Sequence, residues 1–279
     1  MAADRELIAR LPAAAEPARV PAQAPRKLPM AWLGLLLPAA LLLGAELAVR
    51  AGWVASHQLP APSDVLEALQ QLAHQGLLTH IAASTLRVAA GFALGAGLAV
   101  LLGAWVGLSP LAQALLNPSF QALRAIPSLA WVPLLLLWLG IDESPKIALI
   151  AIGAFFPVYV GVASGFRDVD RKLVEVAQLR GLSSVALARR VLLPAALPAV
   201  LTGLRNGLAL AWMFMVAAEL IAASRGLGYL LTDGRETGRA DIVLAAIVLL
   251  ALLGKLSDGL MAAIEARALR WRDGFGAGA

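Results

Sequence analysis

Few side chains in this sequence are of the kinds that do chemistry in enzymes. Cysteine is absent and the three histidines, His57, His74 and His80, are scattered, so the sequence offers neither a thiolate nor a ligand cluster for a metal ion. The one Gly-Lys pair, Gly254-Lys255, lacks the upstream glycine and the following Ser or Thr of a phosphate-binding loop. We therefore expect no catalytic residue, no metal site, no bound cofactor and no nucleotide site on this chain, and we do not expect it to be an enzyme.

Ionisable side chains within apolar segments are costly in a membrane, which makes them candidates for function. Arg205, Trp212 and Glu219 follow one another at intervals of seven residues, which places them along one helix face, with Leu208 and Met215 beside them. Two interpretations stay open. The stripe is either buried against neighbouring helices or lines a translocation path, for which the candidates are Arg205, Trp212, Met215 and Glu219. Arg205 would favour an anionic substrate and Glu219 would oppose it.

Other charged residues in apolar segments have structural explanations. Glu46 and Arg50 are four residues apart near the outer end of the first expected helix, so they can form an ion pair, and Arg87 could also reach Glu46. Lys255 and Asp258 are three residues apart, and we expect them to neutralise one another.

Membrane-spanning helices must position these side chains. The composition is 60% hydrophobic and 15% charged, and the mean hydropathy is +0.78, whereas soluble proteins have ~45–50% apolar and ~25% charged residues. A hydrocarbon core of ~30 Å needs ~20 helical residues per crossing. We predict an all-α integral membrane protein with about six transmembrane helices, at about residues 31–49, 81–108, 120–141, 147–166, 200–221 and 242–264.

The remaining segments predict a single membrane domain with short tails. Residues 1–30 have no apolar periodicity and are expected to form a flexible cytoplasmic tail, residues 31–272 the transmembrane domain, and residues 273–279 a short cytoplasmic tail. After the first span, Asp64-x-x-Glu67 resembles a capping box that opens an external surface helix.

Small-residue motifs predict close helix packing in the second span. Gly91-x-x-x-Gly95 and Gly103-x-x-x-Gly107 each place two glycines on one helix face, which lets a neighbouring helix approach closely in lipid.

A charged segment after the fourth span predicts two short helices joined by a turn. Asp168 and Asp170 can cap the start of the first helix, and Gly181 supplies the left-handed residue that ends it. Ser183 or Ser184 can cap the second helix.

The same segment carries a spaced pattern. It reads Glu175-x-Ala177-x-x-x-Gly181, nine residues, then Val-x-Leu193-Pro194, with Pro194 expected to close the second helix. The pattern resembles the EAA loop of the permease subunits of ATP-binding-cassette (ABC) importers. Two positions depart conservatively from that family's consensus, with Val for Ala after the glutamate and Val for Ile before the Leu-Pro pair. The resemblance implies that this loop, at about residues 167–198, couples the chain to a separate ATPase.

Charge placement predicts the orientation in the membrane. With a cytoplasmic N-terminus, the inside segments hold fifteen Lys and Arg residues and the outside loops hold four. The positive-inside rule therefore places both termini and the Glu175 loop in the cytoplasm, where an EAA loop must lie. Because the basic residues lie between hydrophobic segments, we attribute the pI of 10.2 to membrane topology and expect no nucleic acid partner.

The resemblance extends over nearly the whole chain after residue 30. It includes Leu59-Pro60-x-Pro62, the run 139–146, Ala218-Glu219 with the following Gly-Leu-Gly-Tyr, and the run 251–258. Together these look like the permeases for nitrate, sulfonate, taurine and related substrates, most similar to the aliphatic sulfonate permease.

This resemblance implies a type I ABC importer permease-like bundle in the bacterial inner membrane. The partners it implies are membrane lipid, a second copy of the chain, two ABC ATPase subunits that bind ATP and Mg, and an extracytoplasmic binding protein that delivers the substrate. The loop 222–241 is then an external surface turn or a contact for the binding protein or for gating.

Other substrates and other classes stay open. Taurine, nitrate or a thiamine precursor would use the same architecture. A secondary transporter would be favoured by an inverted repeat or a proton-relay carboxylate, and an intramembrane enzyme would need a nucleophile or metal set facing a cavity. The sequence shows the EAA-like segment instead.

Overall fold

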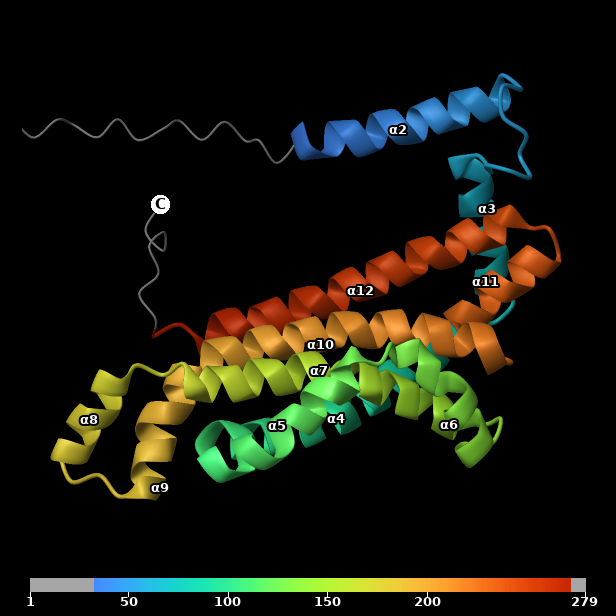
Figure 1. Cartoon of the computed structure of the whole chain (residues 1–279). Coiled ribbons are helices and arrows are strands. Elements are labelled where there is room, and N and C mark those ends of the chain that lie inside the picture. Colours follow the sequence, from blue (N-terminus) through green and yellow to red (C-terminus); the bar gives the residue numbers. More distant parts are fainter. Residues whose placement is uncertain (1–32, 272–279) are drawn as a thin grey trace, which may run out of the picture. The chain divides into compact units, whose positions relative to one another are not determined.

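The computed structural model describes residues 33–271, and every element in that range is helical (Figure 1). The helices in chain order are α2 (Leu33–Arg50), α3 (Pro62–His74), α4 (Leu77–Leu108), α5 (Pro110–Ala125), α6 (Val132–Leu139), α7 (Glu143–Arg167), α8 (Arg171–Leu179), α9 (Ser184–Leu187), α10 (Leu193–Ala222), α11 (Leu227–Glu236) and α12 (Ala240–Ala268). A 3-10 turn, η1 (Ser128–Trp131), precedes α6, and a π turn, η2 (Ala188–Leu192), precedes α10.

The chain divides into two compact units, residues 1–44 and 45–279, and the account below concerns the second. The expected tails, residues 1–30 and 273–279, lie outside the described residues. α2 covers most of the first expected span, residues 31–49, and the start of that span also lies outside the described residues.

Four helical runs in the described part of the chain are long and apolar enough to cross a membrane. They are Leu77–Leu108, Glu143–Arg167, Val185–Ile221 and Ala240–Ala268, and they confirm the second, fourth, fifth and sixth expected spans. The pair formed by α5 and the run η1–α6 would make a fifth as one broken span. An all-α membrane fold is therefore confirmed, while the first of the six spans stays a prediction.

The third expected span, residues 120–141, is wrong as a single helix. α5 ends at Ala125, and the chain turns by 89° before it continues through η1 and α6. The break falls at Ile126 and Pro127, where Ile126 is extended with ψ 123°. The ring of a proline clashes with a helical conformation at the preceding residue and removes an N–H donor, so the apolar run cannot continue as one helix.

α7 lies between α4 and α10 and packs closely on both. A Cβ added at Gly91, Gly95, Gly103 or Gly107 of α4 would collide with residues of α7, in each case within a motif predicted to allow close contact. That prediction is confirmed. On α10, Gly203 approaches Gly161 of α7 so closely that a Cβ added at Gly161 would lie 2.8 Å from the Cα of Gly203.

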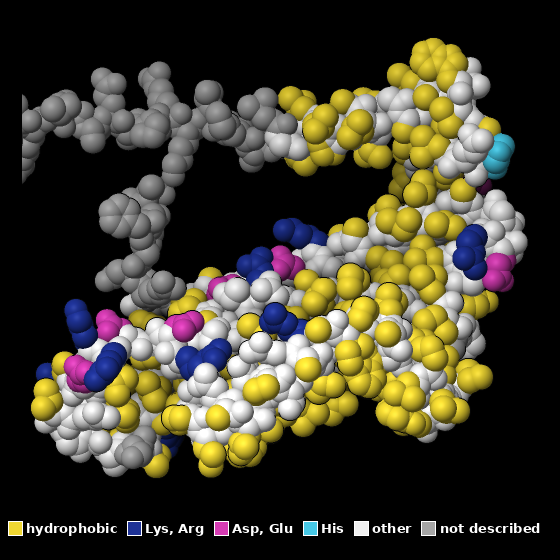
Figure 2. All heavy atoms as spheres, viewed as in Figure 1, with side chains coloured by type: hydrophobic (Ala, Val, Ile, Leu, Met, Phe, Trp, Pro, Cys, Tyr) yellow, Lys and Arg dark blue, Asp and Glu magenta, His cyan; other side chains and the backbone are white. Residues whose placement is uncertain are grey.

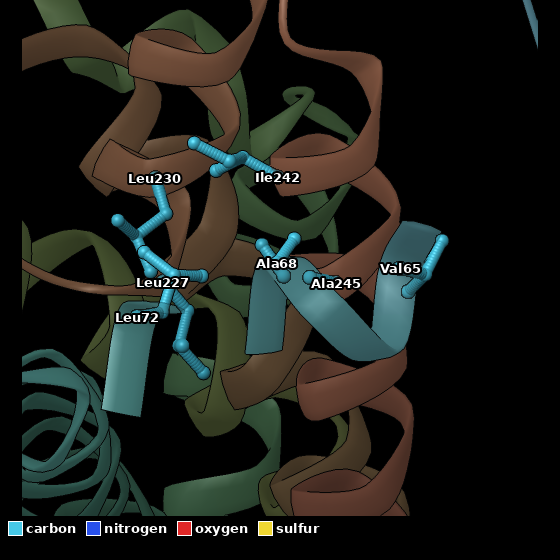
Figure 3. Packing of buried hydrophobic residues seen from close by; sticks show 8 residues of the cluster. Val65, Ala68, Leu72, Leu227, Leu230, Ile242 and Ala245 are labelled. Carbon is cyan, nitrogen blue, oxygen red and sulfur yellow. The ribbon is translucent and has the colours of Figure 1, made fainter. Parts of the chain in front are cut away.

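α3, α11 and the start of α12 share a second hydrophobic core (Figure 3). Its buried members are Val65, Ala68, Leu72, Leu227, Leu230, Ile242, Ala245 and Ala246. A surface turn was one expectation for the loop 222–241. This stretch contains α11, whose apolar side is buried.

The start of α3 also differs from the expectation. Ala61, not Asp64, is the N-cap, and Pro62 takes the first helical turn, where its missing N–H costs nothing. Asp64 instead occupies the third helical position, and its carboxylate accepts a hydrogen bond from the backbone N–H of Ala61 at 3.2 Å. The predicted helix is confirmed, and its predicted cap is wrong by three residues.

A polar contact ties α3 to α12. Arg239, between α11 and α12, donates to the Asp241 carboxylate at 2.6 Å and to the Gln71 side-chain oxygen at 3.0 Å. The hydrogen bond with Asp241 raises the pKa of Arg239. The α11 end of the bundle is therefore held by both apolar and charged contacts.

Candidate coupling loop and buried charge network

The segment between α7 and α10 forms the predicted helix-turn-helix. Asp170 caps α8, since its carboxylate accepts a hydrogen bond from the backbone N–H of Lys172 at 2.9 Å. Ser183 caps α9, where its hydroxyl oxygen accepts a hydrogen bond from the backbone N–H of Ala186 at 3.4 Å. Capping by Asp170 and by a serine at the second helix is confirmed.

Gly181 ends α8 in the manner expected. Its φ is +72°, a left-handed conformation that favours glycine. The N–H of Gly181 donates to the carbonyl of Gln178 at 2.8 Å, and the N–H of Leu182 donates to the carbonyl of Ala177 at 3.2 Å. These two bonds are the pair that defines a Schellman motif, which satisfies the last carbonyls of a helix and reverses the chain.

Pro194 does not close the second helix, contrary to the expectation. α9 continues through η2 into α10, and Pro194 lies in the first turn of α10. The N–H of Leu193 donates to the carbonyl of Ala188, five residues earlier, which marks the wider π turn. Because proline cannot donate and its ring crowds the carbonyl four residues before it, a locally widened turn lets the helix pass through. The loop is consequently joined to a membrane span by continuous helix.

Apolar side chains of the loop are exposed in this chain. Leu179 is 87% exposed and Val185 is 69% exposed, while Leu173 and Val176 are about half exposed. Ala177, in contrast, is buried. Exposed apolar residues grouped on a polar segment are typical of a surface that a partner covers.

The loop is also rich in charge. Figure 2 shows Lys, Arg, Asp and Glu side chains gathered over α8 and α9, at the left of the view, while the surface over α6 is mostly hydrophobic. Glu175 accepts a hydrogen bond from Arg171 at 2.8 Å, in a pair whose arginine is 91% exposed. Since exposed pairs of this kind are worth ~0–1 kcal/mol, Arg171 leaves Glu175 available to another partner.

Arg205 lies on the α12 side of α10. It donates to both carboxylate oxygens of Asp258, at 2.5 and 2.9 Å, and is 3.6 Å from the carboxylate of Glu265. The sequence allowed Lys255 to neutralise Asp258, but the hydrogen bonds of the Asp258 carboxylate come from Arg205. A bidentate guanidinium pair has better geometry than an ammonium three residues away on the same helix.

The next two residues of the predicted stripe are also engaged within the chain. The indole N–H of Trp212 donates to the hydroxyl of Ser257 at 2.9 Å. Met215 is fully buried and packs with Val88, Ile150 and other residues of α4 and α7.

Glu219, near the end of α10, is 1% exposed and sits in a dense hydrogen-bond network. Its carboxylate accepts from the hydroxyl of Ser84 at 2.8 Å, from the guanidinium of Arg87 at 2.7 Å and from the backbone N–H of Gly228 at 2.8 Å. Arg87 also donates to the carbonyl of Arg225 at 2.7 Å. Arg87 also binds Glu143 of α7. We call Ser84, Arg87, Glu143 and Glu219 the charge network; it joins α4, α7, α10 and the turn before α11.

Arg87 does not bind Glu46, a pairing that the sequence allowed. Arg87 instead binds Glu143 at the start of α7 through two hydrogen bonds, of 2.6 and 2.7 Å. Glu46 binds Arg50 at 3.1 Å, as expected, and also the hydroxyl of Ser63 at 2.8 Å. Neither Ser84 nor Glu143 was predicted as a site residue. The available signal was the opposite charges of Arg87 and Glu219 within apolar segments, because Glu143 lies in a charged stretch between two expected spans.

The chain resembles known transport proteins over most of its length. Residues 95–270 match the family described as binding-protein-dependent transport system inner membrane component. The chain is 41% identical over 260 residues to the putative aliphatic sulfonates transport permease protein SsuC of Bacillus subtilis, covering 91% of this chain and 94% of the relative. It is 42% identical over 240 residues to the SsuC protein of Escherichia coli, covering 86% and 91%.

More distant similarity extends to other permeases. The Escherichia coli taurine transport system permease protein TauC is 37% identical over 76% of this chain and 80% of its own length. A structure of the MetNI methionine ABC transporter in inward-facing conformations superimposes with a TM-score of 0.56 at 21% identity, covering 71% of this chain and 96% of that chain. This likeness shows the fold and confirms the expected ABC importer permease bundle. Given the family match over residues 95–270 and the two relatives above 40% identity, this chain belongs to the family of binding-protein-dependent transport system inner membrane components.

Proposed function

We propose that this chain is the permease subunit of an ATP-driven importer and forms the path for small organic anions, specifically aliphatic sulfonates. The observation that carries the substrate class is the similarity to two putative aliphatic sulfonate permeases over 91% and 86% of the chain. Relatives named for taurine, at 37% identity, and for nitrate, at 35%, keep these anions as alternatives within the same architecture.

The proposed complex contains two copies of this chain, two ATPase subunits and an extracytoplasmic binding protein. It lies in the bacterial inner membrane with both termini of each copy in the cytoplasm, as the distribution of Lys and Arg favours. ATP and Mg are bound by the ATPase subunits, whose ATP hydrolysis supplies the free energy for transport.

The coupling loop is proposed to dock into a groove of the ATPase. Its coupling residues are Glu175, Ala177, Gly181, Leu193 and Pro194. Ala177 is buried and supports the loop from within, while Glu175 and the exposed apolar side chains of α8 and α9 form the contact surface. Burial of Leu179 alone removes a nearly fully exposed leucine from water, which favours binding by ~1.5–3 kcal/mol before entropic costs. Glu175 is then available to a basic group of the ATPase.

The continuous helix from α9 to α10 provides the mechanical link. When the ATPase subunits close, the two loops move together, and each α10 moves with its loop because η2 joins them without a gap. The nucleotide state of the ATPase is thereby coupled to the arrangement of the membrane helices, and this coupling drives alternating access. Its strength is the coupling free energy between the nucleotide site and the membrane path. A path along Arg205, Trp212, Met215 and Glu219 remains a prediction, and it would require the hydrogen bonds and packing of these residues to rearrange during the cycle.

Substitution at Gly181 tests the coupling role. Gly181→Val strains the left-handed turn, so we expect loss of ATPase co-purification and of ATP-driven uptake. Gly238→Val is the matched control for ATPase co-purification, because Gly238 has nearly the same φ, +69°, and open space around its Cβ position, but lies between α11 and α12. Normal ATPase co-purification and normal ATP-driven uptake with Gly181→Val would refute the coupling role.

An uptake assay tests the substrate class. The complete importer in proteoliposomes should take up a labelled alkanesulfonate in an ATP-dependent manner, and unlabelled alkanesulfonates should compete better than taurine or nitrate. Competition by nitrate or taurine alone would refute the sulfonate assignment and leave the permease assignment intact.

A further inference from the structure

An open groove lies between α7 and α10. It has a volume of about 590 Å³ and is lined by both helices, by the end of α5 and by η1. Asn206 and Met213 of α10 and Val160 of α7 are exposed along it. Its size falls within the range of ~300–1,000 Å³ that is usual for small-molecule sites.

The exposed side of α10 in this groove is not suited to lipid. Thr202, Asn206 and Met213 line the groove, are exposed and follow helical spacing, while Gly203 is buried against α7. Asn206 lies about 20 Å along the helix from Leu193, near the middle of the span. An amide at that depth is costly in hydrocarbon, so this side of α10 is expected to face water, a ligand or protein.

The charge of the groove is positive. Of the described residues that line it, Arg124 at the end of α5 is the one with a formal charge, and it is exposed. On the other side of α10, Arg205 is bound to Asp258 and Glu265. The described residues that line the groove include Arg124 but no carboxylate, which favours an anion there.

The remaining lining suits an anion with an apolar tail. The hydroxyl of Ser128 and the amide of Asn206 add hydrogen-bond donors, whereas the hydroxyl of Thr202 already donates to the carbonyl of Pro198 at 3.0 Å. Phe156 and Met213 supply apolar surface in the same groove.

We propose that this groove is a transit site for the substrate: Arg124, with Ser128 and Asn206, binds the sulfonate oxygens while the alkyl chain lies on Phe156 and Met213. The assignment of the alkyl sulfonate as occupant rests on the proposed function. The proposed positive, water-accessible character of the groove depends on Arg124 and Asn206 alone, so it can be tested separately.

Cysteine labelling tests the groove without transport. The chain has no cysteine, so Asn206→Cys places a single thiol in this chain of the detergent-purified importer. The probes are an anionic and a cationic methanethiosulfonate, and the anionic probe is itself an alkyl sulfonate. Labelling is read from the intact mass of this chain. The labelling rate of each probe is normalised to its rate with a small free thiol. We expect the anionic probe to react about fivefold faster or more, because Arg124 attracts one probe and repels the other.

Two further variants make the labelling result decisive. Arg124→Gln in the Asn206→Cys background should abolish the preference for the anionic probe. Leu256→Cys, on an exposed apolar face of α12, should react slowly with both probes. The proposal is overturned if Asn206→Cys reacts no faster than Leu256→Cys, or if the preference for the anionic probe is absent or survives Arg124→Gln.

Uptake tests the role of the groove in transport. Arg124→Gln should lower alkanesulfonate uptake at low substrate concentration about tenfold while ATPase co-purification is retained. Arg124→Lys should restore most of the uptake. The control Lys255→Gln should take up the substrate like the wild type. Uptake by Arg124→Gln within twofold of the wild type, or loss of assembly in this variant, would overturn the transit site. Absence of alkanesulfonate uptake by the wild type, with the labelling preference intact, would instead reject the proposed substrate and leave an anion groove.

Discussion

Removal of the Glu219 carboxylate should destabilise this chain more than removal of an exposed carboxylate at the same end of the bundle. In Glu219→Ala, the guanidinium of Arg87 loses one of its two carboxylate partners, and the N–H of Gly228 loses its acceptor. Loss of one partner of a buried pair costs ~3–5 kcal/mol. Since Arg87 is 4% exposed but keeps its two bonds to Glu143, we place the cost at the lower end, ~3 kcal/mol.

Thermal unfolding of the detergent-purified chain, followed by tryptophan fluorescence, measures this loss. A cost of ~3 kcal/mol corresponds to a melting temperature lower by about 6–12 °C for a domain of this size. Glu236→Ala is the control, because the contact of Glu236 with Arg235 is exposed and 3.8 Å long, and such contacts are worth ~0–1 kcal/mol. Glu219→Gln should fall between the two, since its amide keeps an acceptor for Arg87 but cannot satisfy every neighbouring donor. A Glu219→Ala variant that melts within 2 °C of Glu236→Ala would refute the view that the charge network stabilises the bundle.

Two further predictions concern packing and hydrogen bonding in the spans. Gly95→Val should lower the melting temperature, because its side chain would collide with the backbone of Ala151 and overpacking costs ~1–3 kcal/mol, while Gly97→Val on the open face of the same helix should not; equal melting of the two variants would contradict the close packing of α4 on α7. Trp212→Phe should cost ~1 kcal/mol through loss of the bond to Ser257, and Ser257→Ala should add little in the Trp212→Phe background; additive losses would show that the two side chains are not coupled.

Local rules predicted the coupling loop better than its continuation. Gly181 and Asp170 act within a few residues of their partners, so turn and capping preferences identified both. The effect of Pro194 depended instead on whether the chain beyond it stayed helical, and the strongly apolar α10 does so by means of the π turn. The break before α6 has a local signal in Pro127, but the sequence is apolar on both sides of it, which is also typical of one continuous span.

Partners of buried charges were harder to predict than the charges themselves. Arg87 and Glu219 were both recognisable as ionisable residues in apolar segments. They lie 132 positions apart, and Glu143 lies 56 positions from Arg87, so the pairing depends on which helices are neighbours. From the sequence, Arg87 could equally have paired with Glu46, a carboxylate on the same expected side of the membrane. The packing of α4 on α7 is what brings Glu143 within reach instead.

α10 links the coupling loop, the groove and the charge network mechanically. Its first turn continues from α9 through η2, its middle carries Asn206, and its end carries Glu219. A helix transmits displacement along its length, because its backbone hydrogen bonds are internal. Movement of the loop must therefore either break the bonds from Ser84 and Arg87 to Glu219 or carry α4 along. The close glycine contacts of α4 and α10 with α7 favour movement of the three helices as one body. The walls of the groove on α7 and α10 would then keep their relative position. A change in the shape of the groove would come from movement of the groups that cover its open side.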